Sequence, residues 1–422
     1  MRMNVTSEIG RLKSVLVHLP GREIDVMVPP MMAQLLFDDI LYGQVAREEH
    51  RRFQQLIRFV ADEVIDLQDL LEEVLENDQA REAIVRDLAK RNGLRRRLVA
   101  QLLEQPAGAL AEVLIAGIAR ETESGELPQF DLLPIPNLFF MRDPQIVLGD
   151  RVVISSMATN ARRREALLSK YVFENHPKLR QETPFWVDFM DTERERPMSR
   201  NLPTLEGGDV LVARRDLLLV GVTERTNKAG VETLIRSLEK ANAGVKSVII
   251  VDIPRQRSFM HLDTIFTFIN RHECLIYPPV ILPSGGQAAK VTMVDLTKKR
   301  SVAYTEQKSL LGALKKRRID LEPIACGGPN AVDQQREQWT DGANAFALAP
   351  GIILLYERNV RTAETLAKHG YHIVYEDDVL LGRTELETWT DKKYALQIAG
   401  NELSRARGGP RCMTMPLQRE EI

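Results

Sequence analysis

A cysteine late in the sequence lies in surroundings that favour a reactive thiol. Cys412 follows a Gly-Gly-Pro-Arg run, and Arg405, Arg407 and Arg411 stand close before it. Neighbouring positive charge favours the thiolate, and glycines let the backbone and sulfur approach a ligand closely. An isolated loop cysteine is more often a small structural residue, so this interpretation requires partner residues elsewhere in the chain.

Three other motifs carry side chains suited to acid–base chemistry or ion binding. Asp143 ends an apolar stretch, Glu206 precedes two glycines, and His261 stands two residues before Asp263. Because residues i and i+2 of a strand share a face, His261 and Asp263 are predicted to point into one cleft. Taken singly, Asp143 and the Glu-Gly-Gly-Asp motif are typical of turns, and a lone histidine is typical of a core.

Together the four motifs supply a nucleophile, a general acid–base and three carboxylates. A planar cation suits such a cleft, because a guanidinium pairs with carboxylates through parallel N–H···O bonds. The other cysteines, Cys274 and Cys326, are interpreted as core or loop residues. The sequence has neither a disulfide framework nor a Cys/His cluster at metal-binding spacing. We therefore expect no metal ion and no organic cofactor.

The elements that must position these residues form a weak repeat. Three hairpin candidates are followed by a polar, arginine-containing helix start, and two of those helices lead to a further strand, at 245–251 and 371–375. The module is therefore hairpin, helix, strand, and its recurrence indicates duplication. The hairpin candidates are the segments 144–154, 210–220, 265–277 and 345–356, and the helix starts are 159–165, 223–227 and 357–362.

Residues 66–126 break this pattern. Apolar residues recur there at helical spacing, with polar residues on the opposite faces. The sequence predicts an inserted, all-helical subdomain, and the run 95–97 of three arginines is interpreted as a solvated helix face rather than a nucleic-acid patch. The predicted helical stretches are 66–74, 80–90, 95–103 and 107–118.

Composition and charge are those of a soluble globular protein. The chain has 422 residues, 44% of them hydrophobic and 27% charged, and a formal net charge of -2. Such a balance gives no overall attraction to nucleic acid or to an anionic membrane. No apolar run reaches the ~18 residues of a membrane helix, and the first residues lack a signal-peptide pattern. We expect a cytoplasmic protein with a small-molecule substrate; a homo-oligomer is left open.

Seven stretches, in order along the chain, resemble the bacterial arginine deiminases, a guanidino-modifying family built on the pentein fold. The resemblance implies an α/β-propeller of five hairpin–helix–strand modules, with one catalytic domain over residues 1–422 interrupted by the helical insertion at 66–126. The matching stretches are 10–18, 35–40, 137–144, Glu-Gly-Gly-Asp at 206–209, Met-His-Leu-Asp-Thr at 260–264, 339–344 with 349–351, and Arg-Gly-Gly-Pro-Arg-Cys-Met-Thr-Met-Pro at 407–416.

The resemblance also implies a role for each reactive side chain. Cys412 would attack the guanidinium carbon of L-arginine and form a covalent amidino intermediate. His261 would protonate the leaving ammonia and then take a proton from the water that releases L-citrulline. Asp143 and Asp263 would hold the guanidinium nitrogens. Glu206 would pair with His261 and favour its protonated form.

Arginines at the two helix starts and in the cysteine loop are implied to bind the α-carboxylate of the substrate. They are Arg162, Arg225 and Arg407, with Arg163 and Arg164 as neighbouring candidates for the first position. The planar fork of an arginine suits a carboxylate independently of the resemblance. Without the resemblance, Arg162 and Arg225 would be interpreted as surface helix residues.

Three carboxylates near Cys412 would raise the pKa of its thiol, against the effect of the arginines. We therefore expect the thiolate to form chiefly when the cationic substrate binds. Two features depart from the common pattern of the family: Met141 stands where a threonine is common, and the segment 376–393 is long.

Other functions remain open from the sequence. An amidinotransferase would pass the same covalent amidino group to an amine instead of water. A related hydrolase would act on agmatine or a methylated arginine, although carboxylate-binding arginines disfavour agmatine. A non-catalytic arginine-binding protein is disfavoured, because binding alone needs no nucleophile.

Overall fold

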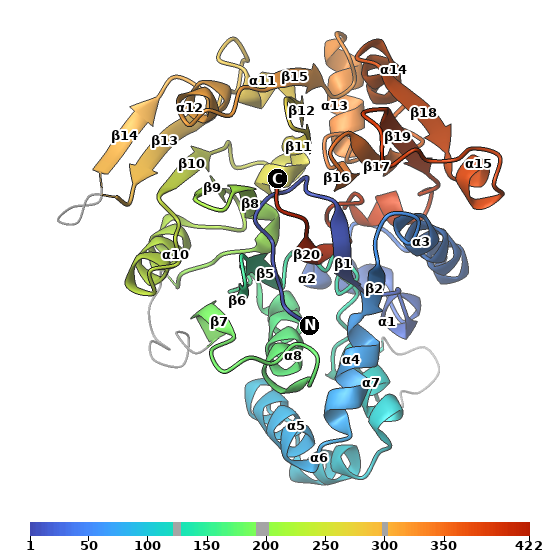
Figure 1. Cartoon of the computed structure of the whole chain (residues 1–422). Coiled ribbons are helices and arrows are strands. Elements are labelled where there is room, and N and C mark those ends of the chain that lie inside the picture. Colours follow the sequence, from blue (N-terminus) through green and yellow to red (C-terminus); the bar gives the residue numbers. More distant parts are fainter. Residues whose placement is uncertain (121–127, 191–201, 298–302) are drawn as a thin grey trace.

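The four predicted hairpins are antiparallel strand pairs in the computed structural model, which describes residues 1–120, 128–190, 202–297 and 303–422 (Figure 1). Apolar, β-branched runs form the strands, and Gly149 and Gly351, with φ of 59° and 78°, make two of the turns. The pairs are β5 (Gln145–Leu148) with β6 (Arg151–Ile154), β8 (Val210–Arg214) with β9 (Leu217–Val222), β11 (Phe266–Asn270) with β12 (Glu273–Ile276), and β16 (Phe346–Ala349) with β17 (Ile352–Tyr356).

Each hairpin gains a third strand, parallel to its second. These strands are β7 (Phe185–Asp188), β10 (Ser247–Asp252), β15 (Glu322–Ala325) and β19 (Lys393–Ile398). The three predicted helix starts lead into α8 (Arg163–Asn175), α10 (Lys228–Lys240) and α14 (Val360–Lys368). The predicted strand 245–251 is β10, and 371–375 is β18 (Tyr371–Tyr375), which pairs with β19 at the edge of its sheet.

A fifth group has the same pairing but is built from both ends of the chain. β1 (Leu12–Val17) runs antiparallel to β20 (Met415–Arg419) and parallel to β2 (Glu63–Asp66), and α3 (Gly43–Ile57) lies between β1 and β2 in the sequence. Figure 1 shows β1 and β20 side by side near the centre of the molecule. The sequence does not reveal this group as a hairpin, because its two antiparallel strands are far apart along the chain.

Four consecutive helices occupy most of the predicted helical insertion. They are α4 (Leu67–Leu75), α5 (Asp78–Asn92), α6 (Arg96–Leu103) and α7 (Ala107–Ala116), and Figure 1 shows α5 and α6 at the lower end of the molecule. Side chains of Asp66 and Asn77 cap α4 and α5. The last predicted helix is too long, because Gly117 ends it with φ 80° and β3 (Ile118–Ala119) then pairs with β4 (Phe130–Leu132). Residues 121–126 of the predicted insertion lie outside the described residues.

The remaining elements surround these groups. Three buried apolar clusters form the core, one of them continuous from the sheet of β5 to α4, α5 and α7. No helix in the described part of the chain is long and apolar enough to cross a membrane. The elements that surround the five strand groups are α1 (Arg22–Asp25), α2 (Met32–Leu35), β13 (Lys290–Asp295), β14 (Ala303–Gln307), α11 (Pro278–Ile281), α12 (Leu310–Lys316), α13 (Ala331–Trp339) and α15 (Glu376–Leu380).

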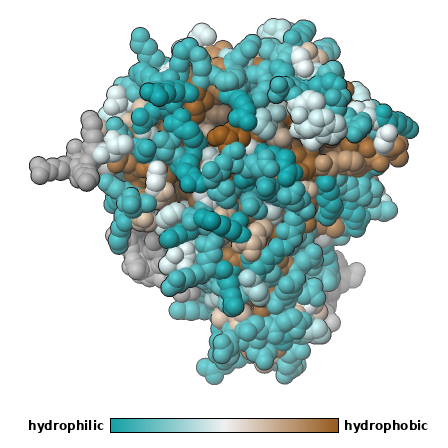
Figure 2. All heavy atoms as spheres, viewed as in Figure 1, coloured by the Kyte–Doolittle hydropathy of each residue, from teal (hydrophilic) through white to brown (hydrophobic). Residues whose placement is uncertain are grey.

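Figure 2 shows a mostly hydrophilic face, with a hydrophobic strip where β18 and α15 lie in Figure 1.

Candidate active site

The predicted catalytic residues occupy equivalent places, in the segments that lead into the first strand of each group. Because the groups share one pairing pattern, residues at these places are brought toward one centre. Asn344, which the sequence analysis gave no role, occupies the corresponding place before β16. The others are Asp143 before β5, Glu206 before β8, His261 and Asp263 before β11, and Cys412 before β20.

The structure brings the predicted nucleophile, acid–base group and carboxylate-binding arginines to one small cavity. Its volume is about 20 Å³, room for about one water molecule. Glu206 and Asp263 contact this cavity through His261 and Cys412. A substrate the size of arginine therefore requires an opening of the site. The lining residues include Cys412, His261, Asp143, Arg162, Arg225 and Arg407.

Cys412 is held in place by its backbone. Its N–H donates to Oδ1 of Asn344 (3.0 Å), and Nδ2 of Asn344 donates to the carbonyl of Asp263 (3.0 Å). The Cys412 sulfur lies 3.8 Å from Oδ2 of Asp263. A side chain at Gly409 would begin 2.7 Å from Asn344 Oδ1, so the loop needs glycine there. Asn344 thus positions both the nucleophile and a carboxylate.

The thiol of Cys412 is not activated in this ligand-free structure. Burial, followed by the charges of Asp263 and Asp143, holds its pKa well above the usual value. The arginines near it in sequence are directed elsewhere: Arg411 binds Asp263 and Arg405 pairs with Asp39 on the outside. The acids therefore raise the pKa of Cys412 more than the arginines lower it.

His261 and Glu206 form a buried ion pair. Nε2 of His261 lies 2.9 Å from Oε2 of Glu206, and Nδ1 lies 3.8 Å from Oδ1 of Asp143. Burial alone would lower the pKa of His261, but Asp143, Glu206 and Asp209 raise it, and the same pair lowers the pKa of Glu206 against the effect of burial. The imidazole is therefore held in its protonated form.

His261 and Asp263 do not lie on a strand, as the sequence analysis predicted. His261 has extended backbone angles and is followed by a 3₁₀ turn at Leu262–Thr264, so the i, i+2 argument is wrong although both residues reach the site. Asp209 fixes this turn by accepting the N–H of Leu262 (2.8 Å), and burial raises the pKa of Asp209 to about 7. Its signal in the sequence is the last position of Glu-Gly-Gly-Asp.

The glycines of that motif allow close packing, as predicted. A side chain on Gly208 would begin 2.7 Å from the imidazole of His261, and one on Gly207 would overlap the carbonyl of Arg142. The N–H of Gly208 donates to Oδ1 of Asp143 (3.1 Å). Glycine at these positions therefore lets the backbone bind one active-site carboxylate and contact the histidine.

Arg162 reaches the site but pairs with its carboxylates. Its Nη1 donates to Oδ2 of Asp143 (2.8 Å) and lies 3.6 Å from Oε2 of Glu206, while Nε and Nη2 bind Glu165. Glu165, three residues along the chain, is a partner that the sequence analysis missed. The guanidinium of Arg162 thus occupies the position beside Asp143 that was expected for the substrate.

Arg225 and Arg407 keep hydrogen-bond donors without partners among the described residues. Nη1 of Arg225 and Nε and Nη1 of Arg407 are buried and unsatisfied, as is the acceptor Oδ1 of Asp263. The Arg407 guanidinium stacks 3.4 Å over the ring of Trp339. Buried hydrogen-bond donors and acceptors without partners at one site are typical of a site that binds a polar ligand.

A segment after α2 covers the cavity. Leu36 and Asp38 line it, Arg257 pairs with Asp38 (2.5 Å), and Arg405 of the cysteine loop pairs with Asp39 (2.9 Å). These two ion pairs hold the cover over the site. Opening of the cavity therefore requires that these contacts change.

Asp143, Glu206 and His261 are the described residues whose ligand atoms lie close enough to hold a metal ion, within 4.8 Å of one another. The space between the two carboxylates already contains the Arg162 guanidinium. The guanidinium of Arg162 and the protonated imidazole of His261 therefore supply the positive charge that a metal ion would otherwise provide.

The two departures from the family pattern lie outside the cavity. Met141 is fully buried in the apolar core. The segment 376–393 begins as α15, whose Glu376 pairs with Arg52 and accepts the N–H of Ala399. Neither feature is among the residues that line the cavity.

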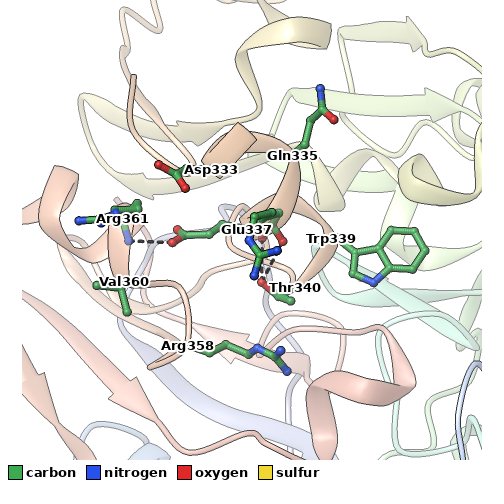
Figure 3. Close-up of a pocket in the computed structure, with 9 residues that line it drawn as sticks. Asp333, Gln335, Glu337, Trp339, Thr340, Arg358, Val360 and Arg361 are labelled. Carbon is green, nitrogen blue, oxygen red and sulfur yellow. Dashed lines mark hydrogen bonds between the residues drawn. The ribbon is translucent and has the colours of Figure 1, made fainter. Parts of the chain in front are cut away.

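A wider groove of about 690 Å³ lies outside Trp339, over α13 and the start of α14 (Figure 3). Arg358 lines it and donates to Ser404, in the turn that precedes Arg407. Groove residues therefore contact the cysteine loop from its outer side.

Comparisons with known proteins show the family of the chain. The family model described as arginine deiminase matches residues 33–419. The arginine deiminase of Clostridium perfringens is 35% identical over 441 residues, covering 100% of this chain and 98% of that protein, and that of Bacillus cereus is 33% identical over 439 residues, covering 100% and 99%. The chain belongs to the arginine deiminase family.

Solved structures extend the likeness to the fold of this arginine deiminase family member. An AgrE variant in complex with L-arginine aligns with a TM-score of 0.51 at 14% identity, covering 97% of this chain and 41% of that one. The N-terminal domain of ArgZ, a cyanobacterial arginine dihydrolase bound to its product, aligns with a TM-score of 0.50 at 15% identity, covering 96% and 97%. These neighbours have the mixed α/β pentein fold, which confirms that part of the predicted fold.

Proposed function

We propose that this protein hydrolyses L-arginine to L-citrulline and ammonia. The observation that carries the proposal is the set of groups buried at this one site. They are a thiol, a protonated histidine, a carboxylate oxygen of Asp263, and donors of Arg225 and Arg407, the last three without partners among the described residues. Free arginine carries a guanidinium and a carboxylate that complement these groups. Its full-length relatives at 33–35% identity are arginine deiminases.

In the proposed reaction the substrate's charge activates the thiol. A guanidinium between Asp143 and Asp263 offsets the two carboxylates that raise the pKa of Cys412, and the thiol releases its proton to solvent. The thiolate attacks the guanidinium carbon, His261 protonates the departing ammonia, and an amidino thioether remains. Water then attacks with loss of a proton to His261, and the carbon–sulfur bond breaks to give citrulline and the thiolate.

The arginines have two tasks in this proposal. Arg225 and Arg407 bind the α-carboxylate with the donors that lack partners here. Arg162 is bound to Asp143 before the substrate enters. When the substrate guanidinium takes this position, Arg162 moves toward the α-carboxylate of the substrate. The size of the cavity supports such a movement, because it leaves no room for both guanidinium groups.

Assay of purified protein with L-arginine alone tests the reaction. Equal amounts of citrulline and ammonia are expected, with an amidino adduct on Cys412 in rapidly quenched samples and no turnover by Cys412→Ala. A requirement for an added amine would instead indicate an amidinotransferase. Agmatine turned over as well as arginine would contradict the carboxylate role of Arg225 and Arg407.

We also propose that the five strand groups close into an α/β-propeller, as a single catalytic domain over 1–422 interrupted by the helical subdomain 66–126. The shared pairing pattern of the groups supports closure. An experimental structure with a gap between neighbouring groups would contradict it.

Cytoplasmic action is proposed because the three cysteines are buried free thiols, as expected in a reducing compartment, and cell fractionation tests it.

A further inference from the structure

A second cavity lies on the other side of α2 and of the turn before α8, and it has no acidic residue among the described residues that line it. Its volume is about 480 Å³. The walls come from α2, the end of α5, the segment 133–135 and the start of α8. The lining residues are Gln34, Arg91, Asn92, Leu133, Pro134, Ile135, Thr159, Asn160, Ala161, Arg163, Arg164 and Leu167.

Arg164 is the residue that indicates a ligand. It is only 7% exposed, it lines the cavity, and within the described parts of the chain no carboxylate lies within ion-pair distance of it. Nη2 donates to the carbonyl of Leu133, and Nε has no partner among the residues that the structure describes. Burial lowers the pKa of Arg164 to about 9, so the group still carries its charge at neutral pH. Glu165 also acts electrostatically on Arg164, but its carboxylate is bound to Arg162. A buried charge without an ion-pair partner of its own is costly, and an anion in the cavity would offset that cost.

The surroundings of Arg164 favour an anion further. Arg163 lines the same cavity, as does Arg91, which is paired with Asp87 (3.0 Å). The N-terminal end of α8 adds the partial positive charge of its helix dipole. The buried hydroxyl of Thr159 also lacks a partner in the part of the chain that the structure describes. Guanidinium groups at a helix N-terminus are a typical phosphate-binding arrangement.

Two properties indicate an organic phosphate rather than a single inorganic ion. The volume of about 480 Å³ far exceeds the ≈ 30 Å³ that one water molecule occupies in the liquid. Leu133, Pro134, Ile135 and Leu167 give the cavity an apolar wall beside its arginines. A phosphate group at the arginines with an attached apolar moiety on that wall would fill both parts.

We propose that this cavity binds a small organic phosphate, with Arg164 as its buried counter-charge. The groove in Figure 3 is a weaker candidate for an anion, because Asp333 and Glu337 lie among its arginines and Glu337 accepts the N–H of Arg361. The proposal does not depend on the reaction at Cys412, since none of the groups on which it rests lines the active-site cavity.

Phenyl phosphate is a suitable probe, with inorganic phosphate as its comparison. Calorimetric titration of the intact protein at constant ionic strength should show saturable binding of phenyl phosphate, tighter than that of inorganic phosphate. Arg164→Gln should weaken binding by about 30-fold, the loss expected for a charge-assisted hydrogen bond. Arg336→Gln removes an exposed arginine of the other groove and should change the affinity less than about twofold.

Gln34→Glu provides a second test that leaves all three arginines in place. It adds a carboxylate to the wall at an exposed position and should weaken binding by about 10-fold through like-charge repulsion. No saturable binding to the wild type, equal losses in Arg164→Gln and Arg336→Gln, or equal affinity for phenyl and inorganic phosphate would each overturn the proposal. Melting temperatures of all variants show which of them are folded.

Discussion

Asp263 shows how one carboxylate can serve two purposes at the residue scale. Its Oδ2 accepts from Arg411 (2.7 Å) and faces the Cys412 sulfur, while Oδ1 has no partner in the described part of the chain. Arg411 is itself fixed by two hydrogen bonds to Glu8. The clamp orients Asp263 so that one oxygen remains for a ligand, and Arg411 is thus a positioning residue.

The thiol of Cys412 should be neutral in the ligand-free protein at pH 8, because burial and Asp263 raise its pKa. Thiolate absorbance near 240 nm, measured as the difference between wild type and Cys412→Ala, should be absent at pH 8. The thiolate absorbance should appear when an inert substrate analogue that retains the guanidinium is bound. A ligand-free pKa below about 7 would contradict activation by the substrate.

Asp263→Asn should separate thiol ionisation from catalysis. The pKa of Cys412 should fall because a negative charge is lost, yet kcat/KM should drop by about 100-fold because the substrate guanidinium loses a charged partner. Asp333→Asn removes an acid from the outer groove and should change neither the pKa of Cys412 nor kcat/KM. A kcat/KM unchanged in Asp263→Asn would exclude a role for this carboxylate in binding.

Residue types could be predicted from the sequence, but their pairings could not. The motifs identified Cys412, His261 and the acids because each combines a reactive side chain with glycine or a regular spacing. Arg411 and Asp263 are 148 positions apart, so their ion pair depends on the tertiary fold. The thiol pKa likewise depends on burial, which the neighbouring arginines in the sequence do not reveal.

At the scale of elements, α3 fixes the start of the cysteine loop. Glu49, only 5% exposed, accepts the backbone N–H groups of Asn401, Glu402 and Leu403 at 2.8 to 3.1 Å. A carboxylate that caps three amides orders the turn that ends at Arg407. Helix α3 therefore orders the loop that carries the nucleophile.

Glu49→Gln should loosen that loop. The neutral amide accepts more weakly than a carboxylate and offers one oxygen instead of two, which costs about 1.5–3 kcal/mol. Hydrogen exchange of peptides covering 399–411 should accelerate, and the KM for arginine should rise. Glu48→Gln alters an exposed neighbour on the same helix and should leave exchange unchanged; equal acceleration in both variants would exclude the capping role.

Local patterns predicted the elements well where the structure is local. The four hairpins and α4 to α7 depend on short-range turn chemistry and helical periodicity, and they are found close to the predicted residues. The module also places Arg358 where Arg162 and Arg225 stand, each after the second strand of its hairpin. Arg358 contacts Ser404 instead of the cavity, a difference that depends on which loop packs beside it.

On the scale of the whole molecule, His18 joins elements that are distant in sequence. It follows β1, is fully buried, and contacts Asp66 at the end of β2 (3.3 Å) and Glu23 of α1 (3.2 Å). Burial would lower the pKa of His18, but these carboxylates raise it to about 10. The protonated histidine thus connects the group formed by the chain ends to α1.

This ion pair should make folding stability depend on pH. Because the folded pKa exceeds the unfolded value of about 6.5, the contribution is complete below pH 6.5 and is lost as pH rises toward 10. The fall in unfolding free energy between pH 6.5 and 10 should be smaller in His18→Gln, by on the order of 3 kcal/mol. Urea denaturation measures it, with exposed His272→Gln as control; identical pH profiles for wild type and His18→Gln would contradict the prediction.

The pairing of β1 with β20 has a consequence for biosynthesis. Arg419 donates to the carbonyl of Gly10, 409 positions earlier, so this contact forms only after Arg419 has been translated. Cys412 immediately precedes β20 and cannot take its final position sooner. A nascent chain therefore cannot complete its active site, or begin its guanidino chemistry, before β20 has been synthesised and has left the ribosome.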